Sequence, residues 1–353
     1  MKGLYIGSTG SWAGKNLAVM AIGLWLQREG LRVGYMKPLG VRPKTVDEVV
    51  GDEDAFFVQE VLGLEDDPAL VTPVITPANL RTCSLADRKN ELEYVATAYE
   101  TLSRGRDIML ISGCGEFLHS GRHAGIEGPA LVRELGLKAL IVDRYDSALH
   151  YDTLLGYHEI LEDALAGVLF NDVPEDYLRD AEDILVPYLA EHDIPALGIV
   201  PRDRLLNAIK AVELAWRLGG RIVSGNRESG RIVEDFLIGT MQVDNFMSHF
   251  KQHANSATIV GGDRTDLQLV ALEGQCPCLI LTGNITPDEI IRARSEARGV
   301  PVIVVREDTY SVARKMEEIL NSQKLRELVK IRRAAQLVDN ALDYPALKAK
   351  LGF

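Results

Sequence analysis

The residues best suited to chemistry form a glycine-rich turn at residues 7–16, near the start of the chain, with the sequence GSTGSWAGKN. A bound phosphate needs backbone N–H groups without side-chain obstruction, a helix N-terminus and a cation. Glycines leave the backbone open, and Lys15 stands where a helix is expected to begin. The turn therefore predicts a phosphate-binding loop, whose expected contacts are Gly10, Ser11, Gly14, Lys15 and Asn16.

Three positions around this turn differ from the usual P-loop pattern. Thr9 stands in place of the first glycine, and Asn16 follows the lysine where a Ser or Thr hydroxyl normally binds Mg²⁺. Ser112 ends an apolar run where P-loop enzymes place an acidic residue that positions the metal. We therefore expect nucleotide binding with little dependence on Mg²⁺, and we assign no metal ligand at these three positions. A strand–helix turn that keeps the fold without binding nucleotide remains the alternative.

Further polar residues follow or flank the neighbouring apolar runs. Lys37 directly follows the run at 33–36, and carboxyl ends of parallel strands face the crevice where ligands bind. Carboxylates near such a crevice are able to hold Mg²⁺ beside a phosphate. The candidates for contact with a substrate or a metal are Lys37, Asp52, Asp54 and Glu116. Alternatively, Lys37 is a surface lysine before a proline, and the carboxylates of Asp52 and Asp54 only complement the N-terminus of a helix.

A second glycine-containing turn, at residues 261–266, follows another apolar run and opens a helical pattern. This arrangement is also typical of a ligand site at a helix N-terminus. The candidates there are Gly262, Asp263 and Arg264, with Thr282 after the next run. Equally open is a structural interpretation, in which Asp263 caps the helix and the glycines form the turn.

Buried strands are expected to position these turns. Short apolar runs alternate with helical patterns over residues 1–200, and runs apolar on both faces are typical of a parallel sheet covered by helices. This pattern predicts an α/β fold: a three-layer P-loop domain with a mostly parallel sheet, followed by a second, smaller α/β domain. The runs lie at 4–6, 33–36, 108–111, 139–142, 167–170 and 196–200.

The domain boundary is expected at Pro201, which closes the last of these runs. We predict a first domain over residues 1–200, a second over 202–322 and a helical tail over 323–353. The strands of the second domain are expected at 258–260, 279–281 and 302–305, and its helices at 265–273, 288–298 and 310–320. The charge run Lys330, Arg332 and Arg333 is expected on a solvent-facing side of the tail.

The overall composition excludes several classes of protein. The chain has 353 residues, 46% of them hydrophobic and 25% charged, with a formal net charge of -12. An acidic surface disfavours nucleic acid and anionic membranes as partners. Four irregularly spaced cysteines are typical of a reduced cytosolic protein. We find no signal peptide and no membrane-spanning run, so we expect a cytoplasmic protein. The expected ligand is a small phosphate-containing molecule, and the protein is expected to form a homo-oligomer or to bind a protein partner.

Several of these motifs occur in one order in a known combination of domains. Residues 1–200 resemble the dethiobiotin-synthetase-like P-loop domain at the N-terminus of long bacterial phosphotransacetylases. Residues 202–320 resemble the DRTGG domain that follows in those enzymes, although 263–267 read DRTDL here. The resemblance rests on Gly14-Lys15, Lys37-Pro38, 52–54, Gly113 and Asn171 in the first domain, and on 231–233, 238–241, 261–266, 281–283 and 308–310 in the second.

This resemblance implies roles for individual residues. Lys15 matches the lysine that binds ATP phosphates, Lys37 the lysine that contacts the substrate, and Asn171 the position that contacts the adenine. The acetyl-transfer domain of the long enzymes is a separate C-terminal one, which we do not expect in this chain. The resemblance thus favours a regulatory protein that binds ATP or another nucleotide. The alternatives are an ATP-dependent ligase resembling dethiobiotin synthetase and a structural or oligomerising module without a ligand.

Overall fold

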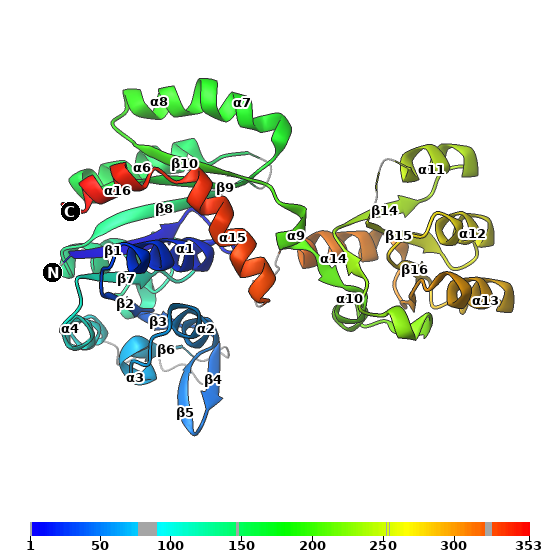
Figure 1. Ribbon diagram of the computed structural model, residues 1–353, viewed down its shortest axis with the longest axis horizontal. Helices are drawn as coiled ribbons and strands as arrows, with labels where there is room; N and C mark the ends of the chain where they lie inside the picture. The colour runs from blue at the N-terminus through cyan, green and yellow to red at the C-terminus, as the bar shows by residue number, and fades with distance from the viewer. Residues whose placement is uncertain (1, 77–89, 146–147, 252, 254, 322–326) are drawn as a thin grey trace. The chain divides into compact units, whose positions relative to one another are not determined.

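The computed structural model describes residues 2–76, 90–145, 148–251, 253, 255–321 and 327–353. The chain divides into two compact units, one of residues 1–202 with 326–353 and the other of residues 203–325. Each unit is built on a mostly parallel sheet with helices packed against it (Figure 1), so the predicted α/β fold class is confirmed. The predicted limit at 322/323 and Cys83 lie outside the described residues.

The first unit contains a six-stranded sheet in the order β10-β9-β8-β1-β7-β2, in which all neighbouring strands pair in parallel. Each strand contains one of the apolar runs predicted from the sequence, because both faces of the sheet are covered. The strands are β1 (Lys2–Ser8), β2 (Val33–Met36), β7 (Ile108–Ser112), β8 (Lys138–Arg144), β9 (Leu165–Val173) and β10 (Ala196–Pro201).

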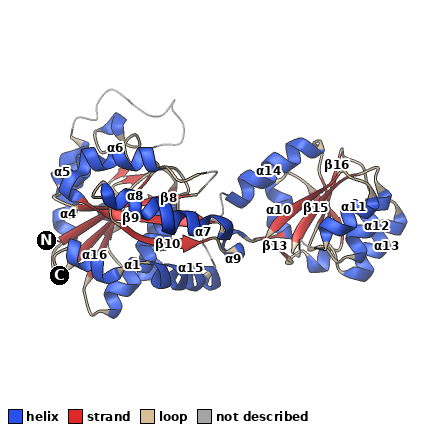
Figure 2. Cartoon of the chain, turned by 90° about the horizontal axis from the view of Figure 1, so that it is seen from above, coloured by secondary structure: helices blue, strands red, loops and turns tan. Residues whose placement is uncertain are grey.

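Helices lie on both faces of this sheet, with α1 on one face and α5 and α6 on the other (Figure 2). Buried residues occupy most positions from Leu17 to Leu26 of α1, because the sheet covers one side and a C-terminal helix covers another. The helices are α1 (Lys15–Arg28), α2 (Glu53–Leu62), α3 (Pro68–Val71), α4 (Glu91–Leu102), α5 (Gly128–Glu134), α6 (Tyr151–Leu161), α7 (Leu178–Asp180) and α8 (Val186–Glu191), the last two joined by a π-helical turn (Ala181–Leu185).

Two small strand pairs lie beside the sheet and were not predicted. β3 (Leu39–Gly40) pairs in parallel with β6 (Val74–Ile75). β4 (Pro43–Val46) and β5 (Val49–Asp52) form an antiparallel hairpin whose strand β5 leads directly into α2. Asp52, the last residue of this hairpin, is therefore also the N-cap of α2.

The C-terminal segment is helical, but it packs in the first unit. α15 (Leu328–Ala341) lies along α1 (Figure 1), and α16 (Tyr344–Lys350) contacts β9 and β10. Trp25 of α1 and Tyr344 stack with ring centroids 4.1 Å apart. The prediction of a solvent-facing charge run is wrong for Lys330, which is buried because its helix covers α1.

The second unit has a five-stranded sheet in the order β12-β17-β16-β15-β14, in which only the edge strand β12 is antiparallel to its neighbour. The strands are β12 (Arg221–Ser224), β14 (Asp235–Gly239), β15 (Ser256–Gly261), β16 (Leu279–Thr282) and β17 (Val302–Val304), with the small pair β11 (Ile209–Lys210) and β13 (Ile232–Val233) beside them. The strands predicted in this unit correspond to β15, β16 and β17.

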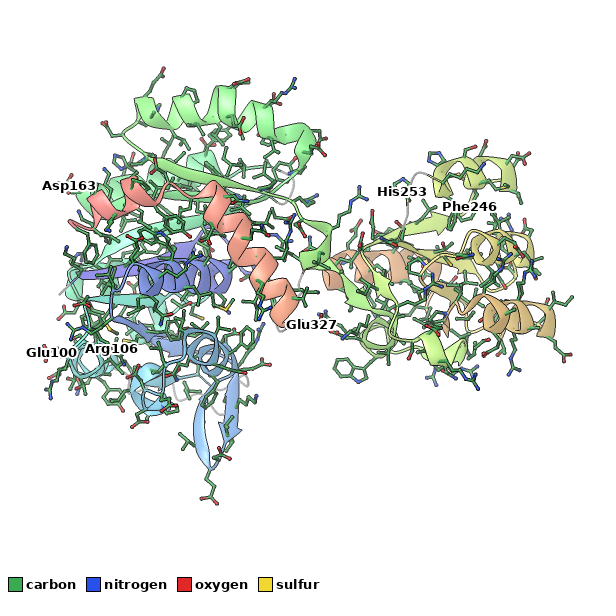
Figure 3. The ribbon with its side chains drawn as sticks, viewed as in Figure 1. Glu100, Arg106, Asp163, Phe246, His253 and Glu327 are labelled. Atoms are coloured by element: carbon green, nitrogen blue, oxygen red, sulfur yellow. The ribbon has the colours of Figure 1, made fainter. Side chains whose placement is uncertain are left out.

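The helices of the second unit follow its strands in the manner of βαβ units. Phe246, labelled in Figure 3, is fully buried on α11 and contributes to the apolar core of this unit. The helices are α9 (Arg204–Asn207), α10 (Ala211–Arg217), α11 (Val243–Phe250), α12 (Thr265–Glu273), α13 (Glu289–Arg298) and α14 (Thr309–Asn321). In the described part of the chain, no helix has both the length and the apolar character needed to cross a bilayer.

Candidate phosphate-binding site

The predicted loop connects β1 to α1 at the carboxyl edge of the first sheet. β1 ends at Ser8 and α1 begins at Lys15, as the motif predicted. Gly14, the N-cap of α1, has a φ of 100°, a left-handed conformation that disfavours side chains. A Cβ at Gly14 would also lie 2.3 Å from Asn171 Nδ2. Glycine is therefore required here to turn the chain into the helix.

The Lys15 ammonium is held against the mouth of this loop. Its Nζ donates hydrogen bonds of 2.6 Å to Ser8 Oγ and 2.6 Å to the Gly115 carbonyl. Burial lowers the pKa of Lys15 to about 8, and the nearby Lys37 acts in the same direction, whereas Cys114 and Asp54 oppose the shift. The ammonium is thus partly withdrawn from water at the N-terminus of α1.

The two positions that departed from the P-loop pattern lie side by side. Ser112 Oγ at the end of β7 is 3.5 Å from Asn16 Oδ1 in the first turn of α1. Mg²⁺ prefers an octahedral set of oxygen ligands, usually with a carboxylate. An amide and a hydroxyl supply no charge at this point, so neither of these two residues replaces the carboxylate. Within the described ranges, no three His, Cys, Asp or Glu side chains are grouped to hold a metal ion.

Lys37, Asp52 and Asp54 form a buried ion-pair cluster beside the loop. Lys37 Nζ lies 2.6 Å from Asp52 Oδ1 and 3.3 Å from Asp54 Oδ2. Asp52 is fully buried and also accepts backbone hydrogen bonds from residues 41, 42, 54 and 55. Its oxygens are therefore engaged in capping α2 and in holding Lys37, which matches the structural alternative for this residue.

The remaining predicted residues of the first unit are more scattered. Asn171, at the end of β9, donates from Nδ2 to the Ala13 carbonyl at 2.9 Å, so its amide supports the loop itself. The Glu116 carboxylate lies 2.9 Å from His119 Nδ1. Gly10 is half-buried and Ser11 is exposed. The structure thus brings Lys15, Asn16 and Lys37 together and directs Glu116 toward a different partner.

Sequence reasoning missed a second set of contacts to the loop from β8. Thr9 Oγ1 donates to the buried Asp143, which also accepts from His150 N at 2.9 Å and lies 2.8 Å from His150 Nδ1. Arg144 donates to the Trp12 carbonyl at 3.3 Å and to Asp172 at 2.8 Å. Asp143 directly follows the apolar run at 139–142, so the rule applied to Lys37 would have identified it.

In the second unit, the predicted residues lie at the carboxyl ends of β15 and β16. Gly262 N donates to the Thr282 carbonyl at 3.1 Å, and Thr282 Oγ1 lies 2.9 Å from Thr309 Oγ1. Arg264 forms a two-point ion pair with Asp266 at 2.9 and 3.0 Å. The alternative in which Asp263 caps α12 is wrong: the N-cap residue is Arg264, with no side-chain hydrogen bond at the cap.

Comparison with known families gives two matches, one after the other along the chain. An AAA domain model matches residues 2–210, and a DRTGG domain model matches residues 213–319. Among solved structures, the chain is similar to the regulatory region, with CBS and DRTGG domains, of Clostridium perfringens pyrophosphatase (18% identity, 39% of this chain and 56% of that one, TM-score 0.29). It is also similar to MinD of Pyrococcus horikoshii with Mg-ADP (17% identity, 58% and 83%, TM-score 0.37).

Curated relatives match over the whole chain or over its first part. Phosphate acetyltransferase of Pseudomonas aeruginosa is 23% identical over 387 residues, covering 100% of this chain and 52% of that enzyme. The enzyme of Nitratidesulfovibrio vulgaris is 22% identical, covering 99% and 51%. The chain thus spans about half the length of these relatives. The ATP-dependent dethiobiotin synthetase of Thermodesulfovibrio yellowstonii is 24% identical over 60% of this chain and 94% of that enzyme.

The loop geometry, the family models and these relatives agree. The chain belongs to the P-loop AAA-domain family, carries a DRTGG domain after it, and is homologous to the N-terminal region of phosphate acetyltransferases and to dethiobiotin synthetase.

Proposed function

We propose that this protein binds ATP or a related phosphate-containing ligand at its P-loop and acts as a regulatory protein. The observation that carries the proposal is the position of Lys15. Its ammonium stands at the N-terminus of a 14-residue helix, directly after the left-handed Gly14. The open N–H groups of the helix start and the adjacent cation together suit an anion such as a phosphate group.

The proposed binding does not rely on a fixed metal ion. Phosphoryl transfer in P-loop enzymes uses Mg²⁺ to neutralise the developing charge. Asn16 and Ser112 supply no carboxylate at the metal position, and Asp52 is already engaged by Lys37 and by backbone N–H groups. We therefore propose a P-loop that kept its phosphate pocket and lost most of its capacity for hydrolysis.

Calorimetric titration with ATP, in EDTA and in Mg²⁺, tests this proposal. Lys15→Ala removes a charge-assisted contact of about 1.5–3 kcal/mol, so we expect a ten- to hundredfold loss of affinity. Lys138→Ala is the matched control, because Lys138 lies at the amino end of β8, whereas the P-loop lies at the carboxyl ends of the strands. Equal affinities of the parent and of Lys15→Ala would exclude the P-loop as the binding site. No heat of binding for any nucleotide would favour a structural module.

A ligase that resembles dethiobiotin synthetase is the second candidate, and the buried Lys37 favours it. Lys37 matches the lysine that contacts the substrate in dethiobiotin synthetase, and two aspartates hold it beside the P-loop. A phosphate-release assay on the parent and on Asn16→Thr/Ser112→Glu separates the two candidates. The regulatory proposal expects turnover only in the double variant, which regains a hydroxyl and a carboxylate for Mg²⁺. Mg²⁺-dependent turnover by the parent that requires Lys15 would establish the enzyme instead.

For the second unit, we propose a ligand or signalling role at the carboxyl edge of its sheet. Gly262, Asp263, Arg264 and Thr282 stay candidates there, and the Asp263 side chain is exposed. A homo-oligomer or a protein partner likewise remains a prediction. Sedimentation analysis with and without ATP tests it directly.

A further inference from the structure

Arg42 lies at the phosphate-binding loop, although the P-loop pattern does not include it. Its guanidinium carbon sits 4.5 Å from the centroid of the Trp12 ring, within the range of a cation–π contact. Trp12 belongs to the loop itself, with a φ of 61° and a side chain that is 43% exposed. The stacked pair of Arg42 and Trp12 therefore lies on the solvent-facing side of the loop that precedes α1.

The backbone of Arg42 is fixed from both sides. Its N–H donates to Asp52 Oδ2 at 3.0 Å, and its carbonyl accepts from Glu53 N at 2.9 Å. Asp52 is the fully buried cap of α2, so the same carboxylate that holds Lys37 also positions Arg42. Because the backbone is already fixed, only the side chain of Arg42 has to be ordered when it contacts a ligand.

Arg42 and Lys37 share a second carboxylate. Asp54 Oδ2 lies 3.6 Å from Arg42 and 3.3 Å from Lys37 Nζ. Lys15 is the third cationic side chain at the loop, and Asp54 also acts on it electrostatically. The two carboxylates of Asp52 and Asp54 offset the charge of Lys37, so Lys15 and Arg42 carry the excess positive charge. Guanidinium groups bind phosphate oxygens through two parallel N–H donors, which an ammonium does not provide.

We infer that Arg42 is a phosphate-binding residue that, with Lys15, supplies the positive charge a metal ion supplies in other P-loop proteins, so that the site takes a metal-free nucleoside polyphosphate. This inference rests on the proposed function of the P-loop. Trp12 stacks on Arg42 and holds the guanidinium over the loop.

The test is the affinity for ATP in EDTA of the parent and of four variants. Arg42→Ala and Arg42→Gln are expected to lose about tenfold or more, because a charge-assisted contact disappears. Arg42→Lys is expected to recover only part of the loss, since it keeps the charge without the planar donor pair. Lys44→Ala removes the same charge from an exposed position two residues away and is expected to bind like the parent.

The affinity for ATP in the presence of Mg²⁺ gives a second measurement, which would not change if Arg42 had a purely structural role. Mg²⁺ carried by the nucleotide is expected to restore several-fold affinity in Arg42→Ala and to change the parent by less than about twofold. Affinities of Arg42→Ala and Arg42→Gln within about twofold of the parent in EDTA would overturn the inference. If those variants bind normally while Lys15→Ala does not, the P-loop proposal stands without Arg42. If the parent binds no ATP at all, both fail.

Discussion

At the scale of single residues, the charge of Lys15 depends on pH in a range that experiments reach. Burial lowers the pKa of Lys15 to about 8 in the folded protein, from 10.5 for the free side chain. Between these values the unfolded chain binds more protons than the folded one, so this group makes the folded state more stable as the pH rises. Below pH 8, the folded protein carries the full cost of the buried charge.

Phosphate binding should reverse this shift, because an anion stabilises the protonated ammonium. We therefore expect ATP to bind with uptake of a proton just above pH 8, and to bind more weakly as the pH rises further. Calorimetry in two buffers with different ionisation enthalpies measures the uptake. Lys15→Arg, which stays charged, is expected to bind without it. Equal proton uptake by Lys15→Arg and by the parent would assign the proton to another group.

Gly14 provides a second prediction at this scale. Gly14→Ala is expected to destabilise the first unit by about 1–3 kcal/mol, because alanine resists the left-handed conformation and its Cβ would meet Asn171. Gly10→Ala is the control, since a Cβ at Gly10 has no neighbour within 4 Å. Urea unfolding followed by circular dichroism compares the two. Equal free energies of unfolding would mean that the loop readjusts at no cost.

At the scale of elements, the start of α2 depends on one carboxylate. Asp52 caps the helix and holds the buried Lys37 at 2.6 Å. Asp52→Ala is expected to cost about 3–5 kcal/mol of stability, because it leaves a buried ammonium without its main partner. Asp67→Ala removes a comparable cap from α3 in an exposed setting and is expected to cost only about 1 kcal/mol. Similar losses in both variants would show that capping alone accounts for the role of Asp52.

The buried strands of both sheets were predictable from the sequence, because residues apolar on both faces form continuous runs. The hairpin of β4 and β5 was not, for a local reason. Its turn residues Asp47 and Glu48 have φ values of 47° and 68°, conformations that a hairpin usually assigns to Asn-Gly. Its strand residues are mostly exposed, so no apolar alternation indicates it. Arg42, whose position depends on this hairpin and on α2, was missed with it.

The residues of the candidate site that belong to a sequence motif were predictable. Those that are placed by tertiary contacts were not. Glycines followed by Lys15 between a strand and a helix identify the loop on their own. The sequence does not show that Asn171 bonds the loop backbone, or that Lys330 is buried on α1, since both depend on elements far apart in the chain. Spacing along a helix indicates which residues share a face, but not what covers that face.

At the scale of the whole molecule, the chain leaves the first unit at residue 202 and returns to it at 326. The returning helices complete its packing: Asp343 N donates to the Leu197 carbonyl of β10 at 2.7 Å, and Tyr344 stacks on Trp25. The fragment 203–325 is therefore expected to unfold cooperatively by itself. The fragment 1–202, with the α1 face uncovered, should bind a hydrophobic dye and melt at a lower temperature.

Thermal unfolding of the two fragments and of the full chain checks this expectation. Adding a peptide of residues 326–353 to the fragment 1–202 should raise its melting temperature, because the peptide binds the folded form only. A peptide with Tyr344→Ala, which removes the ring stacked on Trp25, should do so less. A fragment 1–202 that melts like the full chain would show that α15 and α16 contribute little.

The return of the chain to the first unit also determines the order in which the parts of this unit are synthesised on the ribosome. The six strands and α1 emerge first, but α15 and α16, which cover α1, are translated only after the entire second unit. At about 5–20 residues per second, residues 203–325 take on the order of 10 s to appear. During that interval, the face of α1 that α15 and α16 later cover, including Trp25, is expected to be exposed. The order of the elements in the gene therefore predicts a nascent intermediate with α1 uncovered, which a chaperone is suited to protect from aggregation.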